Sequence, residues 1–396
     1  MQVFNTNSRI IVTCNKRLSP YLVKEIEELG YKPVRVFATG VELEGSVNDC
    51  IPLNLNLRCA SQVLYSLGTF TAPTPTHLYN ELVQIEWEEL IDVMGYFSVT
   101  SVVNNEHIST PLFANVKVKD AIVDRIKEKK GVRPNSGPEL NKTVVNLYWQ
   151  GDKAEIFLDT SGETLSKHGY RKIPGKAPML EALAASTIMA TKWDQKSPFI
   201  NPMCGSGTLA IEAALLATDK SPGLFRMNYA FMHIIGYDEQ VFFAERRKLK
   251  DKAKKQVDFK IIASDISADA VDVAQRNAKT AGVDQLIEFH VCDFAETPVP
   301  QGEQGVIMFN PEYGERLGVH SKLEATYKRM GDYMKQECKG YSGYIFTGNP
   351  DLAKKIGLKA ARRIEFYNGK LDCRLLEYEL YEGTKRQDKK EEPYQF

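Results

Sequence analysis

Metal-binding and disulfide-forming residues are sparse in this sequence. Seven cysteines and six histidines are scattered over 396 residues, without a CxxC pair or a histidine at ligand spacing. The sequence therefore indicates neither a disulfide framework nor a zinc site, and we expect reduced, mostly buried thiols and no metal.

Long apolar runs and an excess of one charge are missing too. No window approaches the roughly 20 uninterrupted apolar residues that cross a bilayer, and the first residues lack a basic segment followed by an apolar one. We therefore expect a soluble, cytoplasmic protein with no membrane partner. Lysine and arginine together number 51, as do aspartate and glutamate, so the net charge is zero. Any surface for nucleic acid must therefore be local.

The chain is too long for a single core, and its pattern changes near residue 164. Before that point short helices and strands are mixed. After it, apolar runs alternate with helices, as in a parallel sheet covered on both faces. We predict an N-terminal α+β segment over residues 1–46, a second module over 47–163, an α/β domain over 164–383 and a charged tail over 384–396.

Periodicity and turn residues predict the individual elements. In the first half they predict strands over 9–16 and 34–44, helices over 20–30, 48–63 and 116–130, and a hairpin over 144–149 and 154–159. In the α/β domain they predict strands over 198–201, 260–264, 287–292, 305–309 and 343–347, helices over 207–217, 268–281 and 323–337, and a closing antiparallel hairpin over 362–367 and 373–381.

A glycine loop joins the first of these parallel strands to a helix in the segment Asn201-Pro-Met-Cys-Gly-Ser-Gly-Thr-Leu. Gly205 and Gly207 let the backbone pass close to a ligand, and the helix that follows offers free amides at its N-terminus. With Ala210 they also satisfy the pattern of a dinucleotide loop. A tight turn with no ligand is a further interpretation.

Two later strands end in acids, Asp265 and Asp293. Ligands of an open parallel sheet lie beyond the carboxyl ends of its strands, so we expect both acids near the glycine loop. Asp265 suits a ribose diol, because a carboxylate accepts two hydroxyl protons, and Asp293 suits an adenine amine. Either acid is also a candidate for a simple turn or helix cap.

The segment Asn310-Pro-Glu-Tyr313 follows the fourth strand and decides the class of chemistry. An exocyclic amine is a poor nucleophile, because its lone pair is delocalised into the ring. The Asn310 side-chain oxygen and the Pro311 carbonyl can accept its two hydrogens and aim the lone pair at a methyl donor. Tyr313 would then stack on the target base.

With these motifs in order, the chain resembles the class I S-adenosylmethionine-dependent methyltransferases that modify amino groups. More specifically it is similar to the bacterial large-subunit ribosomal RNA guanine-N2 methyltransferases, which carry a THUMP domain. Segments that carry the resemblance include Val116-Lys-Val-Lys-Asp-Ala-Ile-Val-Asp, Leu158-Asp-Thr-Ser-Gly-Glu, His168-Gly-Tyr-Arg171 and Ala177-Pro-Met-Leu-Glu-Ala-Leu-Ala. The resemblance implies a doubly wound seven-stranded sheet with a closing antiparallel hairpin, preceded by ferredoxin-like and THUMP modules.

The resemblance also implies a cofactor, a substrate and a set of site residues. S-adenosylmethionine would donate a methyl group to the N2 amine of a guanine in ribosomal RNA. Asn310, Pro311 and Tyr313 would be catalytic, and the segment 169–182 would close over the site. The cofactor would be held by a set of loop and strand-end residues: Asn201, Pro202, Cys204, Gly205, Gly207, Asp265, Asp293 and Asn310.

On the RNA side, the helix over 116–130 is rich in basic residues, and we expect Lys117, Lys119 and Arg125 to contact phosphates. Arg171, in the segment before the glycine loop, is a further candidate for a substrate contact. Charge on a helix is also typical of a merely solvated face.

The sequence departs from the family pattern at two positions: Asn201 stands where the family has Asp, and Glu312 where it has a second proline. Two interpretations of Glu312 follow. In the first its side chain points away and the protein is an active enzyme; in the second the protein binds cofactor and RNA but methylates poorly and acts as an assembly factor. A transfer-RNA guanine-N2 methyltransferase and a DNA adenine methyltransferase are rival functions within the class. A nicotinamide oxidoreductase would explain the glycine loop but not Asn310 to Tyr313.

Overall fold

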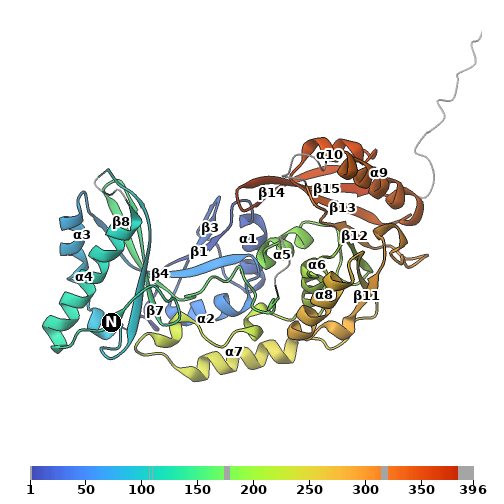
Figure 1. The fold of residues 1–396 in the computed structure, drawn as a ribbon. Helices are drawn as coiled ribbons and strands as arrows, with labels where there is room; N and C mark the ends of the chain where they lie inside the picture. Colours follow the sequence, from blue (N-terminus) through green and yellow to red (C-terminus); the bar gives the residue numbers. More distant parts are fainter. Residues whose placement is uncertain (1, 107, 109, 174–178, 314–319, 382–396) are drawn as a thin grey trace, which may run out of the picture.

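The computed structural model describes residues 2–106, 108, 110–173, 179–313 and 320–381. These residues form two halves, each built on one sheet (Figure 1). The predicted change of pattern near residue 164 coincides with the passage from one sheet to the other, because β8 ends at Asp159 and β9 begins at Phe199.

The N-terminal sheet has eight strands in the order β2-β3-β1-β4-β8-β7-β5-β6. Their bounds are β1 Ser8–Cys14, β2 Arg35–Phe37, β3 Gly40–Gly45, β4 Ala60–Thr71, β5 Tyr96–Asn104, β6 Asn135–Ser136, β7 Thr143–Gln150 and β8 Lys153–Asp159. The predicted hairpin is confirmed as β7 and β8. Because β4 pairs with both β1 and β8, this sheet continues past residue 46 without a break.

Two predictions in this half are wrong. The strand predicted over 34–44 is two short antiparallel strands, β2 and β3. The helix predicted over 48–63 ends at Asn56, and β4 begins at Ala60. The physical reason lies far away in sequence: the buried carboxylate of Glu25 accepts the backbone N–H groups of Arg58 and Cys59 at 2.8 and 3.0 Å, so these groups are unavailable to a continuing helix.

Four α-helices cover the N-terminal sheet: α1 Ser19–Glu28, α2 Val47–Asn56, α3 Pro75–Leu82 and α4 Pro111–Lys130. Helix α4 is the basic helix of the sequence; its apolar stripe, Val118, Ile122, Val123 and Ile126, is buried as expected. The helix begins five residues earlier than predicted, with Pro111 in its first turn, and ends at Gly131 in the left-handed conformation.

The C-terminal sheet has seven strands in the order β11-β10-β9-β12-β13-β15-β14. Their bounds are β9 Phe199–Pro202, β10 Ile261–Asp265, β11 Ile287–Val291, β12 Val306–Phe309, β13 Ser342–Thr347, β14 Arg362–Asn368 and β15 Leu371–Glu379. The first five are parallel, and β15 pairs antiparallel with both β13 and β14. The predicted seven-stranded doubly wound sheet with a closing hairpin is therefore confirmed.

Six α-helices belong to this half: α5 Glu181–Met189, α6 Thr208–Ala217, α7 Glu239–Lys252, α8 Ala268–Ala281, α9 His320–Glu337 and α10 Pro350–Lys355. Helices α5, α6 and α8 lie on one face of the sheet, and α9 and α10 on the other (Figure 1). Neighbouring strand residues alternate between the two cores, as Phe199 and Ile200 do. Short 3₁₀ turns complete the chain: Trp87–Glu89, Pro222–Phe225, Ala230–His233, Asp284–Leu286 and Phe294–Glu296.

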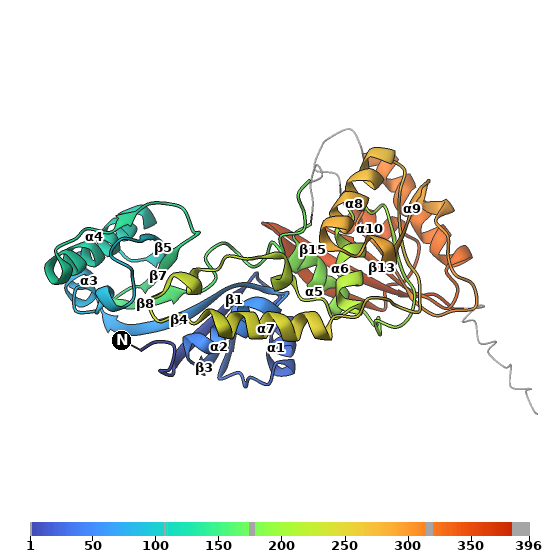
Figure 2. The ribbon, with the colours of Figure 1, turned by 90° about the horizontal axis from the view of Figure 1, so that it is seen from below.

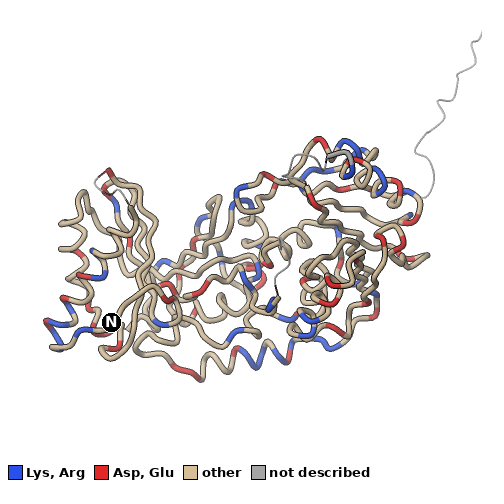
Figure 3. The backbone as a smooth tube through the Cα atoms, viewed as in Figure 1, with Lys and Arg blue, Asp and Glu red and all other residues tan. Residues whose placement is uncertain are grey.

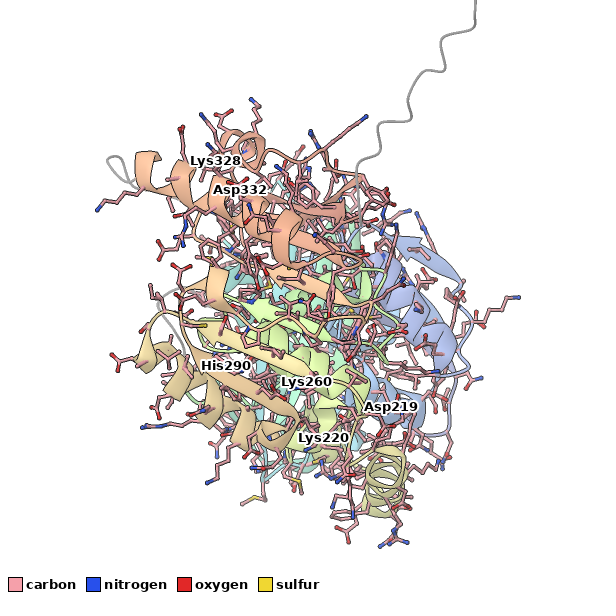
Figure 4. All side chains as sticks on the ribbon, turned by 90° about the vertical axis from the view of Figure 1, so that its right-hand side faces the viewer. Asp219, Lys220, Lys260, His290, Lys328 and Asp332 are labelled. Atoms are coloured by element: carbon pink, nitrogen blue, oxygen red, sulfur yellow. The ribbon has the colours of Figure 1, made fainter. Side chains whose placement is uncertain are left out.

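Helix α7 lies in the segment between α6 and β10 and joins the two halves. It packs against α2 of the N-terminal half (Figure 2). At its C-terminal end Lys252 and Lys254 pair with Asp219, just after α6, and Asp219 is labelled in the end-on view of Figure 4. The C-terminal ends of α6 and α7 therefore lie side by side.

All seven cysteines are free thiols, and six of them are buried. Within the described ranges, no helix is long and apolar enough to cross a membrane. Nor do the described His, Cys, Asp and Glu side chains gather in a group of three that could hold a metal ion.

Candidate active site

The glycine loop connects β9 to α6 and is fastened to the neighbouring strand. The Cys204 N–H donates to the Ser264 carbonyl at 2.8 Å. A Cβ on Gly207, whose φ is +81°, would lie 2.8 Å from the Cβ of Ala274 on α8, so this glycine permits close helix packing. A Cβ on Gly205 would meet nothing within 4 Å, which leaves one side of the loop open to a ligand.

Asp265, at the end of β10, braces this loop. One of its carboxylate oxygens accepts the Gly205 N–H and the other accepts the Ser267 N–H, both at 3.0 Å. The structure thus brings the predicted acid to the glycine loop, and it also shows the turn bond of the simpler interpretation. Each carboxylate oxygen keeps a free lone pair with which it could accept a hydroxyl.

Asp293, after β11, has a different set of partners. It caps the 3₁₀ turn Phe294–Glu296 by accepting the Ala295 N–H at 3.0 Å, and it forms a 2.8 Å ion pair with Arg329 on α9. These are the bonds of a capping residue. Its contact with adenine stays a prediction, and Arg329 is a partner that the sequence did not suggest.

The Asn310-Pro-Glu-Tyr segment leaves the end of β12 and is held from two sides. The Tyr327 hydroxyl of α9 donates to the Glu312 carbonyl at 3.3 Å. The Asn349 amide, two residues after β13, donates to the Tyr313 carbonyl at 3.1 Å. Like Asp293, Asn349 lies two residues after a strand, so the signal used for the acids would have found it.

The side chains of Asn310 and Tyr313 meet, as predicted for a shared site, but not in the predicted arrangement. The Tyr313 hydroxyl donates to the Asn310 side-chain oxygen at 2.9 Å. The Tyr313 ring packs edge-on against Phe346, with centroids 6.2 Å apart. In this conformation the ring is not free to stack on a base, and one of the two lone pairs of the Asn310 side-chain oxygen is occupied. Burial raises the pKa of the Tyr313 phenol well above its usual range, so it remains a donor.

Asn201 lies at the point where β9 and β12 separate. Its side-chain N–H donates to the Met308 carbonyl at 2.9 Å. Its side-chain oxygen is buried and has no hydrogen-bond partner among the described residues. A buried acceptor left alone costs about 1–3 kcal/mol, so this oxygen indicates a donor supplied by a ligand or water.

The residues predicted to contact RNA have different surroundings in the structure. Arg125 forms a bidentate pair with Glu88, at 2.9 to 3.2 Å, and Arg171 pairs with Glu181 at 2.9 Å and donates to the Met179 carbonyl. Both guanidinium groups therefore connect parts of the protein, and an RNA contact by Arg125 or Arg171 stays a prediction. For Lys117 and Lys119, both half-buried on α4, an RNA contact stays a prediction.

A buried pair ties the segment before the loop to helix α6. His168 Nδ1 lies 2.7 Å from a carboxylate oxygen of Glu212, and both side chains are fully buried. His168 Nε2 donates to the Arg58 carbonyl at 2.9 Å. Burial by itself lowers the pKa of His168, but the charge of Glu212 and these hydrogen bonds raise it overall, which favours the imidazolium. Arg58 in turn donates to the Leu215 carbonyl in the last turn of α6 at 3.3 Å.

The comparisons with known proteins agree with this architecture. Residues 168–377, more than half of the chain, match the family model of the RMKL-like methyltransferase domain. Residues 9–64 match the RlmL ferredoxin-like domain and residues 74–159 the THUMP domain.

Individual relatives cover nearly the whole chain. The Ribosomal RNA large subunit methyltransferase K/L of Syntrophotalea carbinolica is 34% identical over 94% of this chain, and the chain spans 54% of that relative's length. The crystal structure of SMU.472, complexed with SAH, is 26% identical, with a TM-score of 0.86 over 96% of this chain and 100% of that one. A predicted N6-adenine-specific DNA methylase from Listeria monocytogenes is 30% identical, with a TM-score of 0.84 over 95% and 97%. The chain therefore belongs to the RMKL-like methyltransferase family.

Proposed function

We propose that this protein transfers a methyl group from S-adenosylmethionine to the exocyclic N2 amine of a guanine in large-subunit ribosomal RNA. The observation that carries the proposal is the placement of Asn310 and Pro311 at the end of β12, next to β9 and its glycine loop. The name of the Syntrophotalea relative supports ribosomal RNA as the substrate, and the SAH complex of SMU.472 supports the cofactor.

The residues present fit this cofactor. The unpartnered, buried oxygen of Asn201 suits an ammonium group, and the open side of Gly205 leaves room for a ligand beside the backbone. Bound there, the cofactor supplies an electrophilic methyl on a sulfonium. Eight residues would hold it: Asn201, Pro202, Cys204, Gly205, Gly207, Asp265, Asp293 and Asn310.

The chain's own part in the reaction is to bind and orient the amine. The Asn310 oxygen and the Pro311 carbonyl accept its two hydrogens, which draws the nitrogen toward tetrahedral geometry. The Asn310 oxygen accepts only the Tyr313 hydroxyl among the described residues, so its second lone pair can accept an amine hydrogen. A rotation of Tyr313 away from Phe346 would free its ring to stack on a base lifted out of its helix.

Mass spectrometry of nucleosides tests the function. Purified protein incubated with S-adenosylmethionine and ribosomal RNA from a strain lacking this gene is expected to produce N2-methylguanosine in the large-subunit RNA. RNA from the parent strain, already modified, is the control and should take up little. Methylation of transfer RNA alone, or of adenine in DNA, the activity for which the Listeria relative is named, would contradict the proposal in favour of those substrates.

Glu312 does not prevent this activity in our proposal. Its side chain is exposed and its carbonyl is held by Tyr327, which supports a carboxylate that stays in solvent beside the acceptor pair. We expect Glu312→Pro to change the rate by no more than about fivefold, because added backbone stiffness is worth about 0.4–1 kcal/mol. Single-turnover methyl transfer measures it. An inactive wild type beside a strongly active variant would instead favour an RNA-binding assembly factor.

A further inference from the structure

A cleft of about 1030 Å³ lies where the two halves meet. Its walls come from three parts of the chain: Gln62 and Leu140 of the N-terminal half, residues within 163–172 and 180–181 before the glycine loop, and residues 225–228 before α7. None of these lining residues belongs to the acceptor pair or to the glycine loop.

The cleft is positively charged in a protein whose net charge is zero. Four cationic side chains line it (Lys167, Arg171, Lys172 and Arg226) against two carboxylates, Glu163 and Glu181, a balance of two positive charges. Basic residues also gather along the second half of helix α7, away from the cleft (Figure 3). The cleft therefore has an excess of positive charge, which the zero net charge of the whole chain does not reveal.

Two of these cations are available to a ligand. Lys167 and Lys172 are exposed, and neither forms an ion pair with any residue the structure describes. Arg226 donates to the carbonyls of Ser161, Glu163 and Asn228 at 2.8 Å. It is fixed in place, but these neutral acceptors do not cancel its charge. Arg226 thus adds to the field that the two lysines present.

One wall of the cleft is linked to the glycine loop by hydrogen bonds. Lys172 precedes Ile173, whose N–H and carbonyl are both hydrogen-bonded by the Asn277 side chain of α8, at 3.4 and 3.1 Å. The same Asn277 amide donates to the carbonyl of Ser206, in the loop, at 3.2 Å. A chain lying in the cleft would therefore pass from the N-terminal half toward the methyl-transfer site.

We propose that this cleft holds the single-stranded RNA that flanks the target guanine, with Lys167 and Lys172 contacting its phosphates; this rests on the proposed function. A lysine ammonium is a point charge that suits a phosphate. Phe225 and Met227, which also line the cleft, supply apolar surface for unstacked bases. A base must leave its stack to be methylated, so the strand beside it is the part that enters.

The test compares the double variant Lys167→Gln/Lys172→Gln with the matched control Lys250→Gln/Lys255→Gln. The control removes the same charge from two exposed lysines that pair with no described residue, Lys250 in the last turn of α7 and Lys255 three residues after it. The end of α7 lies beside Asp219 (Figure 4). This end adjoins the end of α6 farthest from the glycine loop. Binding of an unstructured RNA of about 16 nucleotides is measured by fluorescence anisotropy at several salt concentrations.

Loss of two phosphate contacts should reduce the slope of log K against log salt by about 1.4, and the affinity at 0.1 M salt by about 25-fold. The control should bind like wild type, and SAH should raise the melting temperature of all three proteins equally. Equal affinities and slopes for the three proteins, or no binding by wild type, would overturn the inference. The anisotropy experiment measures RNA binding and needs no methyl transfer. Failure of the proposed function would instead be seen in the nucleoside analysis, as absence of N2-methylguanosine.

Discussion

Replacing Asn310 by alanine is expected to lower the rate of methyl transfer by about 10²- to 10³-fold, the loss typical when one preorganised hydrogen-bonding group is removed from a reacting centre. The reason is that Asn310 supplies one of only two acceptors for the amine hydrogens. The side chain is half-buried at the end of β12 and already accepts a hydrogen bond, so it is preorganised for this role. Single-turnover kinetics at saturating S-adenosylmethionine measure the chemical step.

Tyr313→Phe is the matched control for this prediction. Both substitutions remove the 2.9 Å hydrogen bond between the two side chains, but only Asn310→Ala removes the acceptor. We expect Tyr313→Phe to stay within about tenfold of wild type, because a neutral hydrogen bond is worth about 0.5–1.5 kcal/mol and the ring remains able to stack. If the two variants lost activity equally, the acceptor role of Asn310 would be wrong and a structural role of the pair would explain both.

The second large effect concerns stability. His168→Leu is expected to lower the free energy of unfolding by about 3–5 kcal/mol, because it leaves the Glu212 carboxylate buried without its partner. Chemical denaturation measures this. The double variant His168→Leu/Glu212→Leu should recover most of the loss, since a buried ion pair replaced by apolar groups is often close to neutral. A double variant no more stable than the single one would contradict this account.

The same pair gives stability a defined pH dependence. The pKa of His168 in the folded protein lies above its ordinary value of 6.5: burial opposes the charge, but Glu212 and the hydrogen bonds outweigh it. Folding therefore favours the protonated form. This contribution is complete below pH 6.5 and is lost as the pH rises through the raised pKa. Unfolding of the double variant should lack this decline on the alkaline side.

Much of the C-terminal half could be predicted because its signals are local. Helix α8 runs over the predicted residues, with Ser267 capping its start and Gly282 its end. The predicted strands lie within a residue or two of the observed ones, since each is an apolar run ended by a polar residue. The end of α2 could not be predicted, because it depends on Glu25, more than thirty positions away in the sequence.

The site residues likewise fall into those that local sequence signals could place and those that depend on distant parts of the chain. The glycine loop, Asp265 and Asn310 could be placed from sequence, because the carboxyl ends of parallel strands share one edge of the sheet. The ion pairs of Arg125 with Glu88 and of Arg171 with Glu181 could not be predicted, because their partners lie on other elements. The cleft lined by Lys167 and Lys172 could not be predicted either, because its walls come from three distant segments.

Arg58 shows why the two halves of this chain are not independent building blocks. Its guanidinium donates to carbonyls at the end of α6, and its own carbonyl accepts from His168, so one residue of the N-terminal half serves two places in the catalytic half. If the C-terminal half were produced alone, His168 and the carbonyls of Leu215 and Lys220 would lose their hydrogen bonds to Arg58. An exchange of N-terminal halves between related proteins would therefore have to keep Arg58, just before β4, together with His168 and the end of α6.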